Sequence, residues 1–269
     1  MKNKPTITSL LIYLISLVSV AQNTSEPTET EPLVTDRPDA TESATTISPG
    51  FIQIETGSSY ESFKENSTKF ESFTFNTTLV RLGLLDNLEF RLGWDFVEGQ
   101  TSINNNKLDD VSSGFSPLLF GTKIAISEEK GIRPQMALLG HLYLPFSAGN
   151  DYKPETTGVE FIFAFAHTLS EKSSLGYNIG ANWLDDSAEA SYLYSISYGY
   201  SISETIGAYA EVYGDLPENN TANHFWDAGL TYLVSNNLQF DATVGSGITE
   251  GQDILLSAGV SFKIPTKRN

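Results

Sequence analysis

Apolar and polar residues alternate along most of the chain from Phe51 onward. In the last such run, apolar side chains occupy every even position from Ile254 to Ile264, while the odd positions between them are mostly small or polar. A period of two residues is typical of a strand with one apolar and one polar face. We find twelve such runs and expect a strand in each: 51–60, 70–83, 88–98, 115–126, 133–146, 157–168, 173–184, 190–201, 204–214, 224–234, 237–247 and 253–264.

The length and spacing of these runs favour a membrane barrel. Most runs exceed the roughly 5–6 residues of a soluble strand and match the ~9–11 residues of a tilted membrane strand. The links after even-numbered runs are short, whereas those at 99–114, 147–156 and 215–223 are longer and polar. Short periplasmic turns that alternate with longer outer loops are typical of outer-membrane barrels. The sequence therefore predicts an all-β protein, a single antiparallel up-and-down transmembrane β-barrel of about twelve strands, and a soluble β-sandwich is the alternative.

The run at 70–83 changes its pattern partway. Phe73, Phe75 and Leu79 share parity with Arg81, whereas Val80 and Leu82 lie on the other face. One extra residue in a strand forms a bulge, and the faces of the strand exchange at that point. We expect a bulge near 76–78, which would turn Arg81 into the barrel.

The first residues have the features of an export signal. Lys2 and Lys4 are followed by a mostly apolar stretch, and Ser19 and Ala21 form a small-residue cleavage pattern. We interpret 1–21 as a signal peptide, 22–50 as a periplasmic N-terminal segment and 51–269 as the barrel. The expected location is the cell outer membrane, with the N-terminus in the periplasm. The expected partners are membrane lipid and, during biogenesis, the barrel assembly machinery.

Charge excludes some partners and marks the interior. The chain has 16 Lys and Arg against 33 Asp and Glu, a formal net charge of −17, which argues against binding to nucleic acid. It has no Cys, so thiolate metal sites and disulfides are excluded. Charged residues gather on the parity that we assign to the lumen. The predicted lumen-lining residues are Arg81, Glu89, Arg91, Asp95, Lys123, Glu160, Glu211, Asp227 and Asp241.

A short block before the first strand resembles a known family. It reads TDRPDATES from Thr35 to Ser43, and a G-x-x-Q-x-E strand follows from Gly50 to Glu55. These motifs, together with 81–83 and 88–91, resemble the meta-pathway phenol-degradation family of transporter-like outer-membrane barrels. The resemblance implies a barrel that transports aromatic compounds. The last residues depart from a common barrel pattern, because Lys263–Asn269 follow Phe262.

The same block is a candidate plug for the mouth of the barrel. Asp36, Arg37, Asp39 and Glu42 place four charges within seven residues, and Pro38 holds its neighbour in an extended conformation. We expect Arg37 to pair with carboxylates of the lumen. The alternative is a periplasmic extension that forms only local turns.

The remaining candidate chemistry is sparse. His141, His167 and His224 are widely spaced and show no metal-ligand pattern, so we predict no metal site and no cofactor. A Ser-His hydrolase needs an outward His beside a Ser with a polar third member, and His167 has Thr168 and Ser170 nearby, but at a strand end and not in a cross-strand pair. We therefore predict a non-enzymatic channel or transporter-like barrel for small solutes, which are aromatic or neutral compounds. The alternatives are a packed structural or surface-interaction barrel and, less favoured, an outer-membrane lipid hydrolase.

Overall fold

The computed structural model describes residues 32–184, 186–249 and 251–266, and strands dominate from Phe51 onward. The predicted signal peptide (1–21) and the first part of the N-terminal segment lie outside the described residues. Two short 3-10 helices, η1 (Pro145–Ser147) and η2 (Asn150–Tyr152), follow β6. The strands of the described part are β1 (Phe51–Glu65), β2 (Thr68–Leu85), β3 (Leu88–Ile103), β4 (Asn106–Phe115), β5 (Leu118–Ser127), β6 (Gln135–Leu144), β7 (Gly158–Ser170), β8 (Ser173–Trp183), β9 (Ser191–Ser201), β10 (Ile206–Pro217), β11 (Asn223–Ser235), β12 (Leu238–Gly247) and β13 (Gln252–Pro265).

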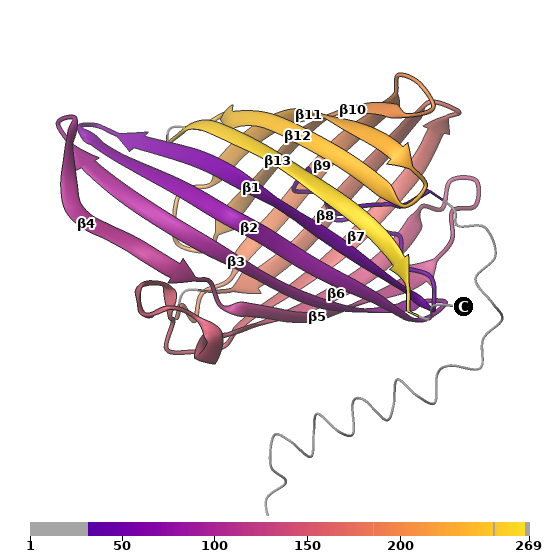
Figure 1. Ribbon diagram of the computed structural model, residues 1–269, viewed down its shortest axis with the longest axis horizontal. Coiled ribbons are helices and arrows are strands. Elements are labelled where there is room, and N and C mark those ends of the chain that lie inside the picture. Colours follow the sequence, from indigo (N-terminus) through magenta and orange to yellow (C-terminus); the bar gives the residue numbers. More distant parts are fainter. Residues whose placement is uncertain (1–31, 185, 250, 267–269) are drawn as a thin grey trace, which may run out of the picture.

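These strands form one closed antiparallel barrel. Each strand pairs with a neighbour in the ring, and the pairing of β1 with β13 closes it (Figure 1). The strand β4 adds no position to the ring, because it pairs with β3 at 96–103 while β5 pairs with β3 at 88–93. β4 and β5 therefore share one place in the wall. The predicted barrel of twelve strands is confirmed.

The expected outer loop at 99–114 is wrong, because this stretch continues β3 into a hairpin with β4. Asn104 and Asn105 make the turn, both with positive φ (51° and 64°), the conformation that a tight hairpin turn requires. Nearly every residue of β4 is exposed. A hairpin that is exposed to water on both faces needs no apolar alternation, so a strand could not be predicted here from the pattern of apolar residues. In Figure 1 the hairpins of β1–β2 and β3–β4 reach beyond the other strands on the left.

The predicted bulge in β2 is confirmed. The pairing of β2 with β3 shifts between Phe75 and Thr78, and Asn76 has a positive φ of 57°. The register with β1 shifts at the same level. The faces of β2 exchange there, and Arg81 becomes completely buried inside the barrel.

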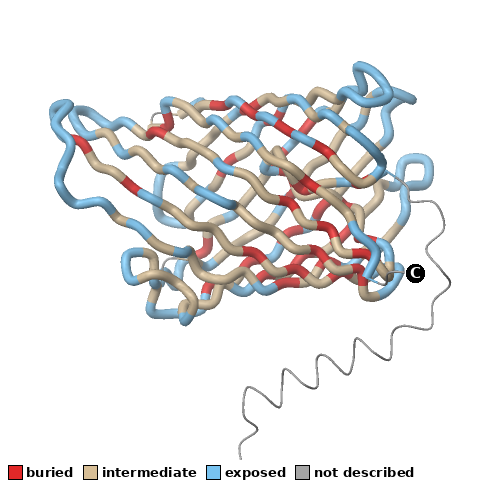
Figure 2. Tube along the Cα trace, in the orientation of Figure 1, coloured by how far each residue is buried: buried red, intermediate tan, exposed pale blue. Residues whose placement is uncertain are grey.

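The outer and inner faces of the wall differ as expected of a membrane barrel. Large apolar side chains such as Phe161, Phe163, Ile179, Leu230 and Phe240 are exposed on the outside. Buried positions are mostly polar or charged, and Figure 2 shows them gathered toward the end that carries the C-terminus. We call this the terminal end, because β1 begins and β13 finishes there, and we call the opposite end the far end. No helix among the described residues is long and apolar enough to span a membrane.

The stretch 32–50 precedes β1, has no regular secondary structure and contacts residues of the barrel interior. We call it the N-terminal segment. Ala44 of this segment packs against the inward apolar side chains of β6 and β7, which are Ala137, Leu139, Ile162 and Ala164. The polar contacts of the segment define the site described next.

Candidate functional site

Asp36 joins the N-terminal segment to three buried cations of the wall. Its carboxylate lies 3.0 Å from Arg81, 2.6 Å from Arg91 and 2.9 Å from Lys123. Arg81 on β2 and Arg91 on β3 are directly opposite in the strand register, so the two guanidinium groups need an anion between them. Burial opposes the charge of the Asp36 carboxyl, but Arg81, Lys123 and Arg91 hold its pKa well below the usual range.

Three further carboxylates complete this charged network. Glu55 pairs with Arg81 at 2.9 Å, and Glu89 pairs with Arg81 at 2.8 Å and with Arg91 at 3.0 Å. Glu42 of the segment accepts hydrogen bonds from Arg91 through both oxygens, each at 2.9 Å. Buried charges are costly unless they are paired, so the segment is needed to balance the wall, and the wall to balance the segment.

Side chains of the wall also satisfy the backbone of the segment. The backbone N–H groups of Asp36 and Arg37 donate to Glu55 Oε2 at 2.9 and 3.0 Å. The N–H of Ile47 donates to Glu89 at 2.9 Å, and that of Glu42 to Asn178 at 2.7 Å. Buried backbone without regular structure must find such partners, which explains how an irregular segment can be held inside a barrel.

Arg37 of the segment contacts the wall at β12 and β13, next to the junction of β13 with β1. Its guanidinium lies 3.0 Å from Asp241 on β12 and 3.1 Å from the Ser257 hydroxyl on β13. The space for it comes from Gly57 and Gly259, which are paired across β1 and β13. A Cβ atom at either glycine would collide with the guanidinium. These glycines were not singled out from the sequence, although a Gly in a strand interior can signal a close approach of another group.

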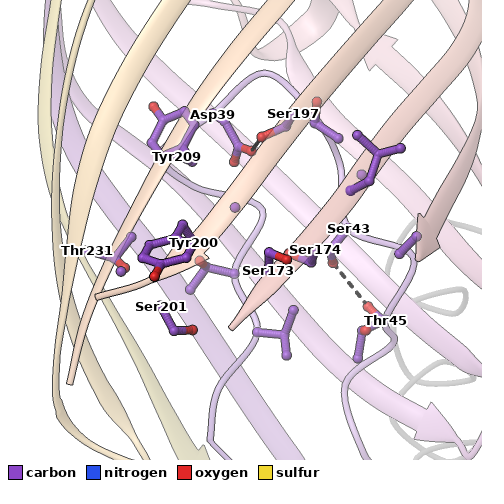
Figure 3. Close-up of a pocket in the computed structure, with 18 of the residues that line it drawn as sticks. Asp39, Ser43, Thr45, Ser173, Ser174, Ser197, Tyr200, Ser201, Tyr209 and Thr231 are labelled. Atoms are coloured by element: carbon purple, nitrogen blue, oxygen red, sulfur yellow. Dashed lines mark hydrogen bonds between the residues drawn. The ribbon is translucent and has the colours of Figure 1, made fainter. Parts of the chain in front are cut away.

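A second group of acidic residues lies on the other side of the segment. Glu211 on β10 is directly opposite Asp227 on β11 and Ser197 on β9. Asp39 of the segment accepts a hydrogen bond from Ser197 at 2.9 Å (Figure 3). Glu211 accepts hydrogen bonds from the Ala40 N–H, at 2.7 Å, and from the Thr41 hydroxyl. Burial, together with the charge of Glu211, raises the pKa of the Asp39 carboxyl well above its usual range.

A cavity of about 580 Å³ lies between the N-terminal segment and strands β7–β12. Asp39, Thr41 and Tyr209 contribute to its lining, and Figure 3 shows Asp39 and Tyr209. The wall strands contribute mainly small or hydroxyl-bearing residues. These include Ser173, Ser174, Gly176, Ser197, Gly199, Ser201, Gly207, Ala208 and Thr231. The cavity exists because these strands carry short side chains where β1, β2, β3 and β5 carry long charged ones.

The structure places the nine predicted lumen residues in three settings. Arg81, Glu89, Arg91 and Lys123 form the network on Asp36, and Asp241 pairs with Arg37. Glu211 and Asp227 belong to the second acidic group. The last two have other partners: Glu160 accepts hydrogen bonds from His141 and Tyr143, and the backbone N–H of the partly buried Asp95 donates to Ser116.

The histidines form no hydrolase arrangement within the described part of the chain. His141 pairs with Glu160, His167 stacks on Tyr177, and His224 hydrogen-bonds to Tyr194. No His ring among these residues forms a hydrogen bond to a Ser hydroxyl. In the same ranges, no group of three or more His, Cys, Asp or Glu is arranged to hold a metal ion.

A closed twelve-stranded antiparallel ring with an apolar outside and a charged inside defines an outer-membrane β-barrel. The family model described as "Putative MetA-pathway of phenol degradation" matches residues 35–264, and the chain belongs to this family. No curated protein matches the sequence.

Two solved structures share the fold. One is the COG4313 outer membrane channel from Pseudomonas putida F1, with a TM-score of 0.63 and 12% identity over 90% of this chain and 100% of that chain. The other is the KdgM porin in complex with disordered oligogalacturonate, with a TM-score of 0.50 and 9% identity over 78% and 98% of the two chains. At these identities the likeness is one of fold.

Proposed function

We propose that this protein is a passive outer-membrane channel for small solutes, narrowed by its own N-terminal segment. The observation that carries this proposal is the cavity of about 580 Å³ between the segment and strands β7–β12. On the opposite side, the segment is tied to the wall by buried ion pairs. A solute would therefore pass on the side with small residues, along a path that is fixed by the fold.

The comparisons support this function without naming the solute. The two structures with the same fold are described as a channel and a porin, and the family description refers to phenol degradation. The volume of the cavity lies within the range of about 300–1,000 Å³ that is typical of small-molecule sites. Serine and threonine hydroxyls in its lining suit a neutral or aromatic solute with a hydroxyl group, and we propose no catalysis.

The orientation and the domain limits form part of the same proposal. Residues 1–21 would be removed on export, residues 22–50 would enter the barrel from the periplasm, and 51–269 would form the wall. The terminal end then faces the periplasm, and the exposed β3–β4 hairpin faces outward. Asp36, Arg37, Asp39 and Glu42 would act as the plug, and the nine inward charged residues would line or anchor the path.

Conductance in planar bilayers tests the proposal. We expect single-channel current from the refolded protein, and a larger current after deletion of 35–43, because the segment narrows the lumen. A matched control shortens the far-end hairpin by removing 102–107, which should leave the conductance unchanged. Equal currents with and without 35–43 would show that the segment does not restrict the path.

One observation favours a second candidate. The dense ion pairs around Asp36 would also suit a packed structural barrel. That reading predicts no current from the intact protein and none from the deletion variant, although both insert into the bilayer.

A further inference from the structure

The second acidic group, Asp39, Glu211 and Asp227, has no cationic partner within the described residues, whereas the network around Asp36 has three. Asp39, Glu211 and Asp227 take part in none of the ion pairs formed between described residues. Glu211 and Asp227 are 3% and 2% exposed. The Oδ1 atom of Asp227 is buried and has no hydrogen-bond partner among these residues. A buried carboxylate oxygen without a partner is costly, so this position is suited to a positively charged donor.

We propose that Asp39, Glu211 and Asp227 bind the ammonium group of a small primary amine, whose organic part occupies the adjoining cavity. The proposal rests on the channel function above and adds a cationic class of solute to the neutral and aromatic compounds proposed there. Asp39, Ser197 and Tyr209 connect the two parts of this site, because Asp39 hydrogen-bonds to Ser197 and all three line the cavity. Figure 3 shows Asp39, Ser197 and Tyr209 close together at its edge.

The arrangement of the carboxylates favours an ammonium group over a metal ion. Two of them come from neighbouring strands, which lie about 4.8 Å apart, and the third comes from the segment. Ammonium donates three hydrogen bonds of about 2.8 Å, whereas metal ions need their oxygen ligands within about 2.6 Å. The described residues hold no group of three acids arranged for a metal. An ammonium group can donate one N–H to each of the three carboxylates.

The site also fits an amine with a short carbon chain. Gly199 and Gly207 lie beside the Ser and Thr hydroxyls of the cavity wall, so an alkyl chain meets little steric resistance there. On the other side of the segment, the side chains of Arg81, Arg91 and Lys123 supply the positive charge that pairs with Asp36. The amine would thus take the place at this site that Lys123 takes beside Asp36.

Calorimetric titration of the refolded full-length barrel in detergent tests this proposal. The probe is n-butylammonium chloride, compared with 1-butanol, tetramethylammonium chloride and CaCl₂ at the same ionic strength. We expect butylammonium to bind, while butanol lacks the charge and tetramethylammonium lacks the N–H donors. Glu211→Gln and Asp227→Asn should weaken binding at least about tenfold, since a hydrogen bond to a charged group contributes a factor of ten or more. Asp109→Asn, on the exposed β4, is the matched control and should bind as the unchanged protein does.

A variant in the segment keeps the test valid if a wall substitution prevents folding. Asp39→Asn changes no strand and should also weaken butylammonium binding. Equal binding of tetramethylammonium would overturn the assignment to N–H donors, and binding of Ca²⁺ in place of butylammonium would make the site a metal site. Absence of butylammonium binding throughout pH 5 to pH 9 would overturn the proposal. In each of these cases, current from the intact protein would still support the channel itself.

Discussion

The wall built by β1, β2, β3 and β5 and the wall built by β8–β11 present different side chains to the same lumen. The first carries long charged residues, which hold the N-terminal segment through Asp36 and Glu42. The second carries mainly Gly, Ser and Thr, and a cavity lies beside it. Both walls follow the same period-two pattern, so the size of the inward side chains decides which wall anchors the segment and which lies beside a cavity.

The two walls also differ in how completely their charges are paired. On the first, Arg81, Arg91 and Lys123 face Asp36, Glu42, Glu55 and Glu89, an excess of one negative charge. On the other side, Arg37 forms an ion pair with Asp241. Asp39, Glu211 and Asp227 form no ion pair within the described residues. The comparison separates a region whose charges attach the segment from a region whose carboxylates have no cationic partner within the described residues.

The largest effect should come from removing a cation of the first wall. Arg91→Met would leave Asp36, Glu42 and Glu89 with too little positive charge, and removal of one partner of a buried ion pair costs about 3–5 kcal/mol. We expect a loss of this size in the free energy of unfolding, measured by denaturant titration in detergent. Ser197→Ala on the second wall is the control and should cost only about 0.5–1.5 kcal/mol. Similar losses for the two variants would contradict the division of roles between the walls.

An intermediate effect is expected where Arg37 lies against the wall. Gly259→Ala places a Cβ atom on the guanidinium, and overpacking of this kind costs about 1–3 kcal/mol. The variant should also conduct more current in planar bilayers, because the segment loses one attachment. Gly140→Ala on the outer face of β6, where a Cβ atom makes only ordinary contact with Phe161, should change neither property. An unaltered conductance for Gly259→Ala would show that Arg37 does not hold the segment in place.

A substitution on the second wall should have a smaller effect on stability but should lower the conductance. Gly199→Leu would project into the cavity, where only the flexible Ser174 side chain lies close to the new Cβ atom. Stability should fall by less than about 1.5 kcal/mol, because an open cavity can accept the added volume. Conductance should fall, which single-channel recordings would detect. If the current stays the same, the path does not run along β9.

The smallest effect concerns ion selectivity. The uncompensated carboxylates should give a modest preference for cations, measured as a reversal potential in asymmetric KCl. The preference should fade as salt rises, because the Debye length falls from ~10 Å at 0.1 M to ~3 Å at 1 M. At alkaline pH, where the Asp39 carboxyl is ionised in spite of its raised pKa, Asp39→Asn should reduce the preference more than Glu42→Gln does, because Glu42 already has Arg91 as its partner. Anion preference at low salt would contradict the assignment of charges to the lumen.

The sequence predicted the barrel and much of its interior because both follow from parity. Alternation alone placed Glu89, Arg91 and Lys123 on the inward face, and the exchange of parity in β2 located the bulge that turns Arg81 inward. The β3–β4 hairpin was missed because water on both sides removes the apolar pattern. The specific ion pairs and the pairing of Gly57 with Gly259 could not be predicted, since both depend on the register between strands that are distant in the sequence.

The contacts of Arg37 have a consequence for how the barrel closes. The pairing of β1 with β13 joins strands about two hundred residues apart, and contacts of such long sequence separation form late and carry a large entropic cost. Arg37 spans that junction, with Thr77 on β2 on one side and Ser257 and Asp241 on the other. The segment therefore joins the first and last strands of the chain from within. The residues that we propose to narrow the channel would thus also favour the completed ring over an open sheet.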